Sequence, residues 1–387
     1  MVNMPAWRQK VPSSKVPSEI ERRKAEQLRR AASGHEDSAG GAGWKDVHLV
    51  HQALPRADLH GVDVSTRLLG HRLSAPLVIA AMTGGHQQAA EINRRLAAAV
   101  ERHGLAMGLG SQRAALVNPE LIGTYAAARE LAPSAFLIAN LGAAQLVDQE
   151  SGDRLSAQGV RQAVEMVKAQ ALAIHLNFLE ESVQTGGDRR THGLREALAA
   201  AVTEAGVPVI AKETGSGISR QTAVELRDLG FSALDLGGFG GTSFAAIEAD
   251  RAAERGDARG AQLGMTYRDW GIPTAVSIVG ASAAGLPMIA TGGIRSGLDA
   301  AKAIALGADL VGVARPLLVA ALEGAERLDA WIGHFMEELR LAICLTGGSK
   351  LTDLRSAPLV ISGQTRTWID DLGYELDPER GRGISAS

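Results

Sequence analysis

Eight short runs of apolar residues recur along the chain, and helix-like segments separate most of them. Each run is continuous, without polar residues at alternate positions, which is typical of strands buried on both faces of a parallel sheet. Eight such units in about 270 residues match a (β/α)8 TIM barrel, an α/β fold whose usual size is about 250 residues. A doubly wound open sheet shares the alternation and is the alternative. The runs cover residues 77–81, 105–107, 136–139, 172–176, 208–211, 233–236, 287–290 and 310–314.

The helical patterns between the runs carry an Ala- and Leu-rich stripe with charged residues on the other side, as helices packed on a sheet do. The stretch between the sixth and seventh runs, residues 237–285, is long enough to hold an insertion beyond one helix. The predicted helices cover residues 91–103, 119–131, 158–169, 193–205, 221–229 and 297–306.

Three segments follow from this pattern: a basic N-terminal arm over residues 1–45, one barrel over 46–375 and a disordered tail over 376–387. Residues 1–34 contain eight Lys or Arg and only three Glu. The arm is either a solvated tail with a marginal helix at 18–32 or a lid that closes over an anionic ligand.

Composition excludes several classes of protein. The net charge of −3 argues against a nucleic-acid partner. No apolar run approaches the roughly 18 residues of a membrane span, and the N-terminus lacks a signal-peptide core. Cys344 is the only cysteine, which excludes an intramolecular disulfide, and its apolar surroundings predict a buried, inert thiol. We expect a cytoplasmic homo-oligomer with no membrane partner.

Polar residues or glycines follow all eight runs, and in a barrel these positions meet on one face. The most specific are Thr-Gly-Gly-Ile-Arg-Ser-Gly (291–297) after the seventh run and Ala314-Arg315 after the eighth. Bare backbone N–H groups and a helix N-terminus suit a phosphate group. The alternative is a tight turn that needs glycine. It could explain one such site, but it explains the two sites together less well than a phosphate does. The pattern predicts a phosphorylated cofactor or substrate.

Lys212 ends the fifth run, where a buried charge is costly unless an anion or an electron-rich ring receives it. The pyrimidine edge of a flavin would do so; a salt bridge to a carboxylate such as Glu213 is the alternative.

The fourth run ends in His175, Asn177, Glu180 and Glu181. Carboxylates there could bind a hard divalent ion or transfer protons. A satisfied core histidine and a solvated glutamate pair are the alternative, and the segment has too few ligands for zinc.

These pieces together resemble the type 2 isopentenyl diphosphate isomerases, which are FMN-dependent barrels. The resemblance extends from Glu21 to Ile369. It rests on Val-His-Gln-Ala-Leu-Pro (50–55), Ala-Met-Thr-Gly-Gly (81–85), Gly-Ser-Gln-Arg (110–113), His-Leu-Asn (175–177), Lys-Glu (212–213), Gly-Gly-Thr (240–242), Trp-Gly-Ile-Pro-Thr (270–274) and Leu-Thr-Gly (345–347).

The resemblance implies a reaction that moves a double bond between isopentenyl and dimethylallyl diphosphate. The flavin must be reduced, usually by NADPH, yet no net redox change occurs, and the reduced ring is thought to deliver and remove the proton. The diphosphate would meet Arg23, Lys24, Ser111, Gln112 and Arg113, and Glu181 would hold Mg²⁺. The arm then becomes a lid. The implied FMN contacts are Ala81, Met82, Thr83, Ser111, Asn140, Lys212, Thr242, Gly293, Arg295, Ala314 and Arg315.

Three positions depart from the family pattern. Gln27 replaces a His of the arm, Glu180 replaces the Gln of a Gln–Glu pair, and residues 185–188 read Thr-Gly-Gly-Asp in place of Pro-Glu-Gly-Asp. A second carboxylate beside Glu181 and a diphosphate should have a raised pKa, which suits proton transfer near neutral pH. We therefore predict that Glu180, with His175, contacts the reacting carbon skeleton. The alternative is a tolerated swap in an ordinary isomerase.

Two other functions stay open. One is a member of the same family that acts on a different prenyl substrate. The other is an FMN-dependent oxidoreductase of 2-hydroxy acids, which needs a histidine base after the seventh run. Residues 291–297 supply Arg295 but no histidine there, which weighs against it. A non-catalytic phosphate-binding barrel would leave Lys212 and His175 without a role.

Overall fold

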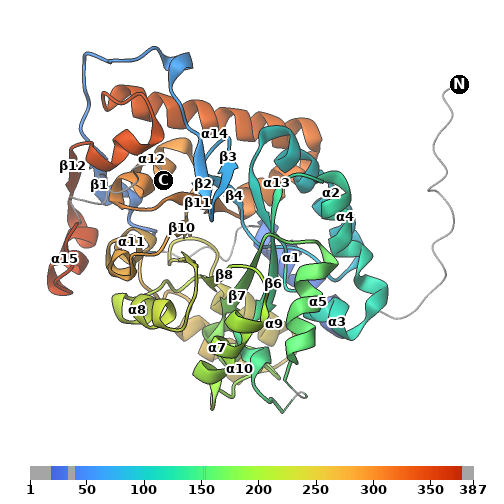
Figure 1. Cartoon of the computed structure of the whole chain (residues 1–387). Coiled ribbons are helices and arrows are strands. Elements are labelled where there is room, and N and C mark those ends of the chain that lie inside the picture. The colour runs from blue at the N-terminus through green and yellow to red at the C-terminus, as the bar shows by residue number, and fades with distance from the viewer. Residues whose placement is uncertain (1–18, 34–39, 151, 153, 377–387) are drawn as a thin grey trace, which may run out of the picture.

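Eight parallel strands close into a barrel in chain order, with the last strand beside the first. The computed structural model describes residues 19–33, 40–150, 152 and 154–376. This closure confirms the predicted TIM barrel over the open-sheet alternative (Figure 1). The barrel strands are β4 (Leu77–Ile79), β5 (Ala106–Gly108), β6 (Phe136–Gly142), β7 (Ala171–Leu176), β8 (Val209–Glu213), β9 (Ala233–Asp235), β10 (Met288–Thr291) and β11 (Leu310–Val313).

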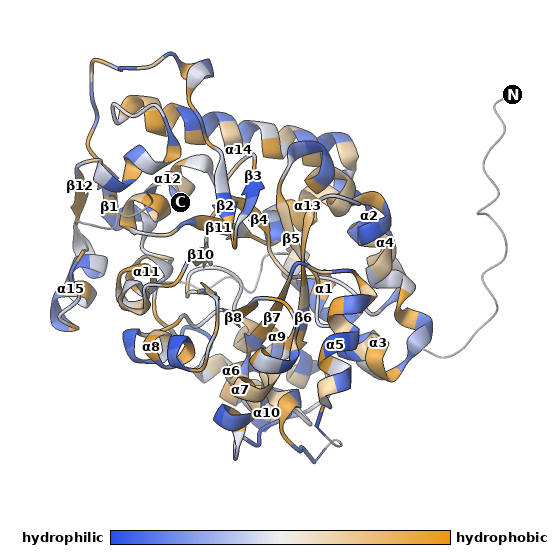
Figure 2. Ribbon diagram, viewed as in Figure 1, coloured by the Kyte–Doolittle hydropathy of each residue, from blue (hydrophilic) through white to orange (hydrophobic). Residues whose placement is uncertain are grey.

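Each predicted apolar run overlaps one of these strands, with ends that differ by up to three residues, because the barrel strands are buried on both faces. Alternate residues such as Val78, Ile138, Ala173 and Ile289 fill the barrel interior. The residues between them pack outward against the helices and form the larger core. Figure 2 shows the same division, with hydrophobic central strands and helices whose outer faces are hydrophilic.

The six predicted helices are present, and several begin at a serine. Ser156, Ser219, Ser243 and Ser296 each accept a hydrogen bond from a backbone N–H three residues on, which satisfies one donor of the first turn. The helices are α1 (Glu19–Ser33), α2 (Gln87–His103), α3 (Arg113–Val117), α4 (Gly123–Leu131), α5 (Ala157–Met166), α6 (Phe178–Val183), α7 (Leu194–Glu204), α8 (Arg220–Asp228), α9 (Phe244–Glu254), α10 (Ala258–Thr266), α11 (Thr274–Ala281), α12 (Gly297–Leu306), α13 (Arg315–Glu323), α14 (Ala325–Leu345) and α15 (Gly363–Asp371).

Two small antiparallel sheets were not expected from the sequence. Strands β2 (Thr66–Leu68) and β3 (His71–Leu73) form a hairpin, and β1 (Val47–Leu49) pairs with β12 (Leu359–Ile361). Leu68 and Leu73 are fully buried against the barrel interior, so the hairpin closes one end of the barrel.

The predicted insertion consists of α9, α10 and α11, and α9 packs against α6. The predicted helix of the arm forms as α1, which contacts α9 and α13. Parts of two predicted segments lie outside the described residues. They are residues 1–18 and 34–39 of the N-terminal arm and residues 377–387 of the C-terminal tail. No helix in the described ranges is both long and apolar enough to cross a membrane. Cys344 is buried, as predicted, with its thiol 3.3 Å from the carbonyl oxygen of Ala57.

Candidate functional site

A cavity opens where the eight barrel strands run out into their loops, and α1 lies along its rim. Residues from the ends of all eight strands and from α1 line it, as expected for the active-site face of a barrel. Nearly all of the predicted site residues reach it. They are Arg23, Lys24, Ala81, Met82, Thr83, Ser111, Arg113, Asn140, His175, Glu180, Glu181, Lys212, Thr242, Gly293, Arg295, Ala314 and Arg315.

Gln112 departs from the prediction, because it does not line the cavity and its side chain is fully buried. The backbone N–H of Gln112 donates to the carbonyl oxygen of Asn140 at 2.9 Å. Its side-chain oxygen accepts from the backbone N–H of Asn140, also at 2.9 Å. Its amide nitrogen donates to the carbonyl oxygen of Ala163 at 2.8 Å. Gln112 thus ties the loop after β5 to β6 and supports the site from behind. The sequence places it in a loop but does not give the direction of its side chain.

One end of the cavity fits a phosphate group. Gly292 and Gly293 have φ of 121° and 68°, and a Cβ on Gly292 would collide with the carbonyl oxygen of Gly238. The N-terminus of the nine-residue helix α13 faces the same cavity at Ala314 and Arg315. Bare backbone, a helix N-terminus and arginine side chains are the donors that a phosphate needs. Thr291 also lines the cavity, and its buried hydroxyl has no hydrogen-bond partner among the residues that the structure describes.

Lys212 lies in the barrel mouth, and 7% of it is exposed. Its ammonium lies 3.1 Å from Asp235 and donates to the carbonyl oxygen of Glu213 at 3.2 Å. The alternative of a salt bridge to a neighbouring carboxylate is thus present, but with Asp235, because the Glu213 carboxylate accepts the backbone N–H groups of residues 215–217 at 2.6–2.9 Å. Lys212 is therefore a neutralised cation that lines the cavity with one of its three N–H donors left over, which is compatible with a flavin edge.

His175 sits opposite Lys212 in the pairing of β7 with β8, and its Nδ1 lies 2.8 Å from Oδ1 of Asn140. The amide of Asn140 is fixed because its nitrogen donates to the carbonyl oxygen of Leu109 at 2.9 Å. Burial, together with the charges of Lys212 and Lys24, lowers the pKa of His175 to about 3. The imidazole is therefore neutral at physiological pH.

Glu180 and Glu181 follow β7 on the short helix α6, and Asn177 lies between them and the strand. The amide nitrogen of Asn177 donates to both carboxylates, at 3.1 Å and 3.3 Å, while its oxygen has no partner within the described part of the chain. Burial and the charges of Glu248 and Glu181 raise the pKa of Glu180 to about 7. Glu180 can therefore gain or lose a proton near neutral pH, as predicted from the sequence.

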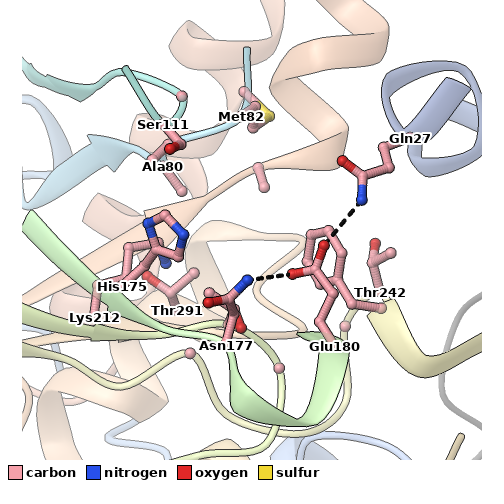
Figure 3. A pocket seen from close by; sticks show the side chains of 18 of the residues that line it. Gln27, Ala80, Met82, Ser111, His175, Asn177, Glu180, Lys212, Thr242 and Thr291 are labelled. Carbon is pink, nitrogen blue, oxygen red and sulfur yellow. Dashed lines mark hydrogen bonds between the residues drawn. The ribbon is translucent and has the colours of Figure 1, made fainter. Parts of the chain in front are cut away.

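A network that sequence reasoning missed continues from Glu180. The amide nitrogen of Gln27 donates at 2.9 Å both to Glu180 and to Glu248 of α9 (Figure 3 shows Glu180 between Gln27 and Asn177). Arg251 binds both oxygens of Glu248, at 2.8 Å and 2.6 Å. Glu248 lies in an Ala-rich helix of the insertion, where no neighbouring motif marks it. Only the packing of α9 on α6 identifies it.

The basic residues gather on the α1 side of the cavity. The Lys24 ammonium donates to the carbonyl oxygen of Ser111 and to the Tyr125 hydroxyl, the latter at 2.9 Å. Burial and the charges of Arg23 and Arg113 lower the pKa of Lys24 to about 7. Arg113 is paired with Asp188, whose own N–H donates to Glu181 at 2.8 Å. Cations from α1 and from the β5 loop thus surround one space, which suits an anionic ligand.

Glu181 was predicted to hold Mg²⁺. It is 5% exposed and lines the cavity. Within the described ranges, no group of three or more His, Cys, Asp or Glu could hold a metal ion by itself. Mg²⁺ keeps several waters and is commonly bound by one or two carboxylates plus substrate phosphates. A single carboxylate, with the unpartnered oxygen of Asn177 nearby, fits an ion that arrives with a diphosphate.

Residues 271–361 match the family model of the FMN-dependent dehydrogenases. The chain is 50% identical over 352 residues to the isopentenyl-diphosphate delta-isomerase of Methanoregula boonei, covering 90% of this chain and 96% of that protein. It is 46% identical over 357 residues to the protein of the same name from Methanothermobacter thermautotrophicus, covering 92% and 97%.

Solved structures of flavoenzymes share the fold. A variant of flavocytochrome b2 with sulfite bound aligns with a TM-score of 0.60 at 17% identity, covering 94% of this chain and 85% of that one. Mandelate oxidase with (S)-4-hydroxymandelic acid aligns with a TM-score of 0.59 at 18% identity, covering 89% and 98%. At this identity the likeness shows the barrel fold.

Proposed function

The chain belongs to the type 2 isopentenyl-diphosphate delta-isomerase family, and we propose that it interconverts isopentenyl and dimethylallyl diphosphate with bound FMN. The observation that carries the proposal is one cavity that joins a phosphate cradle, a buried lysine and two carboxylates to a cluster of basic side chains. These are the groups that a flavin nucleotide and a diphosphate require together.

FMN would be held at its phosphate by Gly293, Arg295, Ala314 and Arg315, and at its ring by Lys212 and the residues after β4. Reduced FMN would supply proton-transfer chemistry next to the substrate, and NADPH is the reductant that we propose. The collision of a Cβ at Gly292 and the unpartnered hydroxyl of Thr291 support this placement.

The diphosphate would lie between Arg23, Lys24 and Arg113, with Mg²⁺ on Glu181. The ion would neutralise charge that the three cations do not cover and fix the phosphates relative to α6. Ser111 also lines the cavity and would contact both the diphosphate and FMN.

The reaction adds one proton to the terminal carbon of the alkene and removes another from the carbon next to the oxygen-bearing one. Atoms and electrons balance without an oxidant. Glu180 can hold or release a proton because its pKa is about 7. His175 is neutral, since its pKa is about 3, and would act as a hydrogen-bond partner rather than as a cationic acid.

Turnover of isopentenyl diphosphate tests this proposal, with FMN, Mg²⁺ and NADPH under anaerobic conditions. Wild type should form dimethylallyl diphosphate at an ordinary enzymatic rate of about 1 per second or faster. Glu180→Gln should lower kcat by about 100-fold, the usual effect of losing a general acid or base. An unchanged rate in Glu180→Gln would remove the special role of this residue.

Parallel assays separate the alternatives. Longer prenyl diphosphates test a different substrate of the same family. Lactate and mandelate in air-saturated buffer, with hydrogen peroxide as the readout, test an oxidase. Oxidation of either hydroxy acid without isomerase activity would contradict the proposal.

A further inference from the structure

Helix α1 presents three polar side chains to the cavity. Gln27 follows Arg23 by four residues and Lys24 by three, so it lies one turn from both on the same side of the helix. All three line the cavity. A ligand that engages Arg23 and Lys24 therefore also fixes the position of Gln27.

The side chain of Gln27 uses both N–H groups of its amide. One reaches Glu180 and the other reaches Glu248, each at 2.9 Å. Glu248 is 3% exposed and is held by Arg251 of its own helix, so it is a rigid anchor for the amide. Gln27 thus connects a fixed point on α9 to Glu180 on α6.

The carboxylate of Glu180 is held at both oxygens. Gln27 donates to Oε1 at 2.9 Å, and Asn177 donates to Oε2 at 3.1 Å. Two donors on opposite oxygens fix the plane of a carboxylate as well as its position. Asn177 belongs to the barrel, whereas Gln27 belongs to α1, so only one of the two constraints depends on the docking of α1.

The two single residues that depart from the family pattern are in contact here. Gln27 stands where the arm of the family carries histidine, and Glu180 stands where its loop carries glutamine. In the structure these two side chains form one hydrogen bond. A neutral amide with two donors suits a position between two carboxylates, because a third carboxylate would repel both.

We propose that Gln27 is a positioning residue. Helix α1 would bind the diphosphate through Arg23 and Lys24, and through Gln27 it would hold the Glu180 carboxylate in place beside the reacting carbons. The proposal rests on the proposed function. Substitution of Gln27 should then change the rate of the chemical step and have little effect on substrate affinity. Substitution of Arg23 or Lys24 on the same helix should mainly weaken substrate affinity.

The test is a double-mutant cycle on steady-state turnover of isopentenyl diphosphate. Gln27→Met keeps the length of the side chain but cannot donate. It should lower kcat by about 10-fold and leave KM within about 2-fold, because the interaction acts after binding. In a Glu180→Ala background, Gln27→Met should change the residual kcat by less than about 2-fold.

The matched control is Arg30→Gln, which breaks a different link between α1 and α9, the pair with Asp250 at 3.4 Å and Glu254 at 2.5 Å. Its kcat should stay within about 2-fold of wild type. Gln27→Asn retains the amide on a shorter side chain and should show the same fall in kcat, which covers the case that Gln27→Met fails to fold.

Three results overturn the proposal. KM rises in Gln27→Met while kcat is unchanged, the losses in the cycle are additive, or Arg30→Gln lowers kcat as much as Gln27→Met does. Failure of the proposed function looks different, because wild type then makes no dimethylallyl diphosphate. In that case, non-additive changes in the thermal stability of wild type, Gln27→Met, Glu180→Ala and the double variant would still show the contact. The positioning role would then be rejected together with the proposed function.

Discussion

Gln112 belongs to a motif that was expected to bind the diphosphate, but its own side chain stabilises the fold. It belongs to the Gly-Ser-Gln-Arg segment of which Ser111 and Arg113 reach the cavity, yet its own amide is satisfied by Asn140, Ala163 and Met166. Side chains of consecutive residues point in different directions, and only the backbone path decides which of them faces a ligand.

Gln112→Leu should therefore destabilise the fold. The substitution leaves the backbone N–H of Asn140 and the carbonyl group of Ala163 buried without partners. We expect the free energy of unfolding to fall by about 2–4 kcal/mol, measured by urea denaturation. Gln262→Leu on the exposed side of α10 is the control and should stay within about 0.5 kcal/mol of wild type. Equal stability of the Gln112 and Gln262 variants would contradict a scaffold role.

Lys24 should take up a proton when a diphosphate binds. Its pKa is about 7 without ligand because burial and two arginines disfavour its charge, and a bound diphosphate favours that charge. At pH 8 most of Lys24 is neutral, so binding should take up close to one proton and affinity should fall as pH rises above 7. Calorimetry of dimethylallyl diphosphate binding in buffers of different ionisation enthalpy measures the uptake.

Lys24→Met provides the control, because it removes this group and leaves the titration of the ligand itself. Wild-type heats that depend on the buffer no more than those of Lys24→Met would show that Lys24 does not change its protonation.

Two elements, the loop after β10 and helix α13, build the phosphate cradle together. Arg315 starts α13, so its side chain and the first N–H groups of the helix face the same space. Arg315→Ala should weaken FMN binding about 30-fold, which corresponds to about 2 kcal/mol for a charge-assisted contact to phosphate. Fluorescence titration of the apoprotein with FMN measures this. Arg327→Ala on exposed α14 should bind as wild type does; equal loss in both variants would contradict the assignment.

Helix α1 is the element most directly coupled to substrate in this account. Its contacts to α9 are ion pairs and hydrogen bonds, from Glu26 and Arg30 as well as from Gln27. The groups on the α1 side of these contacts are partly exposed, and within the described residues no backbone ladder joins α1 to the barrel, so α1 should open more readily than the barrel. Tryptic cleavage near Arg23 should therefore slow when dimethylallyl diphosphate is added and should not slow with the corresponding alcohol. Equal cleavage with and without the diphosphate would contradict a lid.

Across the whole molecule, the sequence predicted the elements that hydrophobic burial determines. Continuous apolar runs located all eight barrel strands, because both faces of each strand are covered. The pairs β2–β3 and β1–β12 were missed because β1, β2 and β3 each carry a polar residue in the middle, so none of them forms a continuous apolar run. Glu248 and the partners of Gln27 were missed for another reason, since residues more than 150 positions apart meet only once α1, α6 and α9 are packed.

We propose that the whole barrel performs an isomerisation that needs a reduced flavin and consumes no reductant. The sharpest test follows dimethylallyl diphosphate by proton NMR, anaerobically, in protein whose FMN is either oxidised or reduced once by dithionite. We expect many turnovers per flavin with the reduced protein and none with the oxidised protein. Equal rates in the two states, or product formed only in proportion to the reductant added, would contradict it.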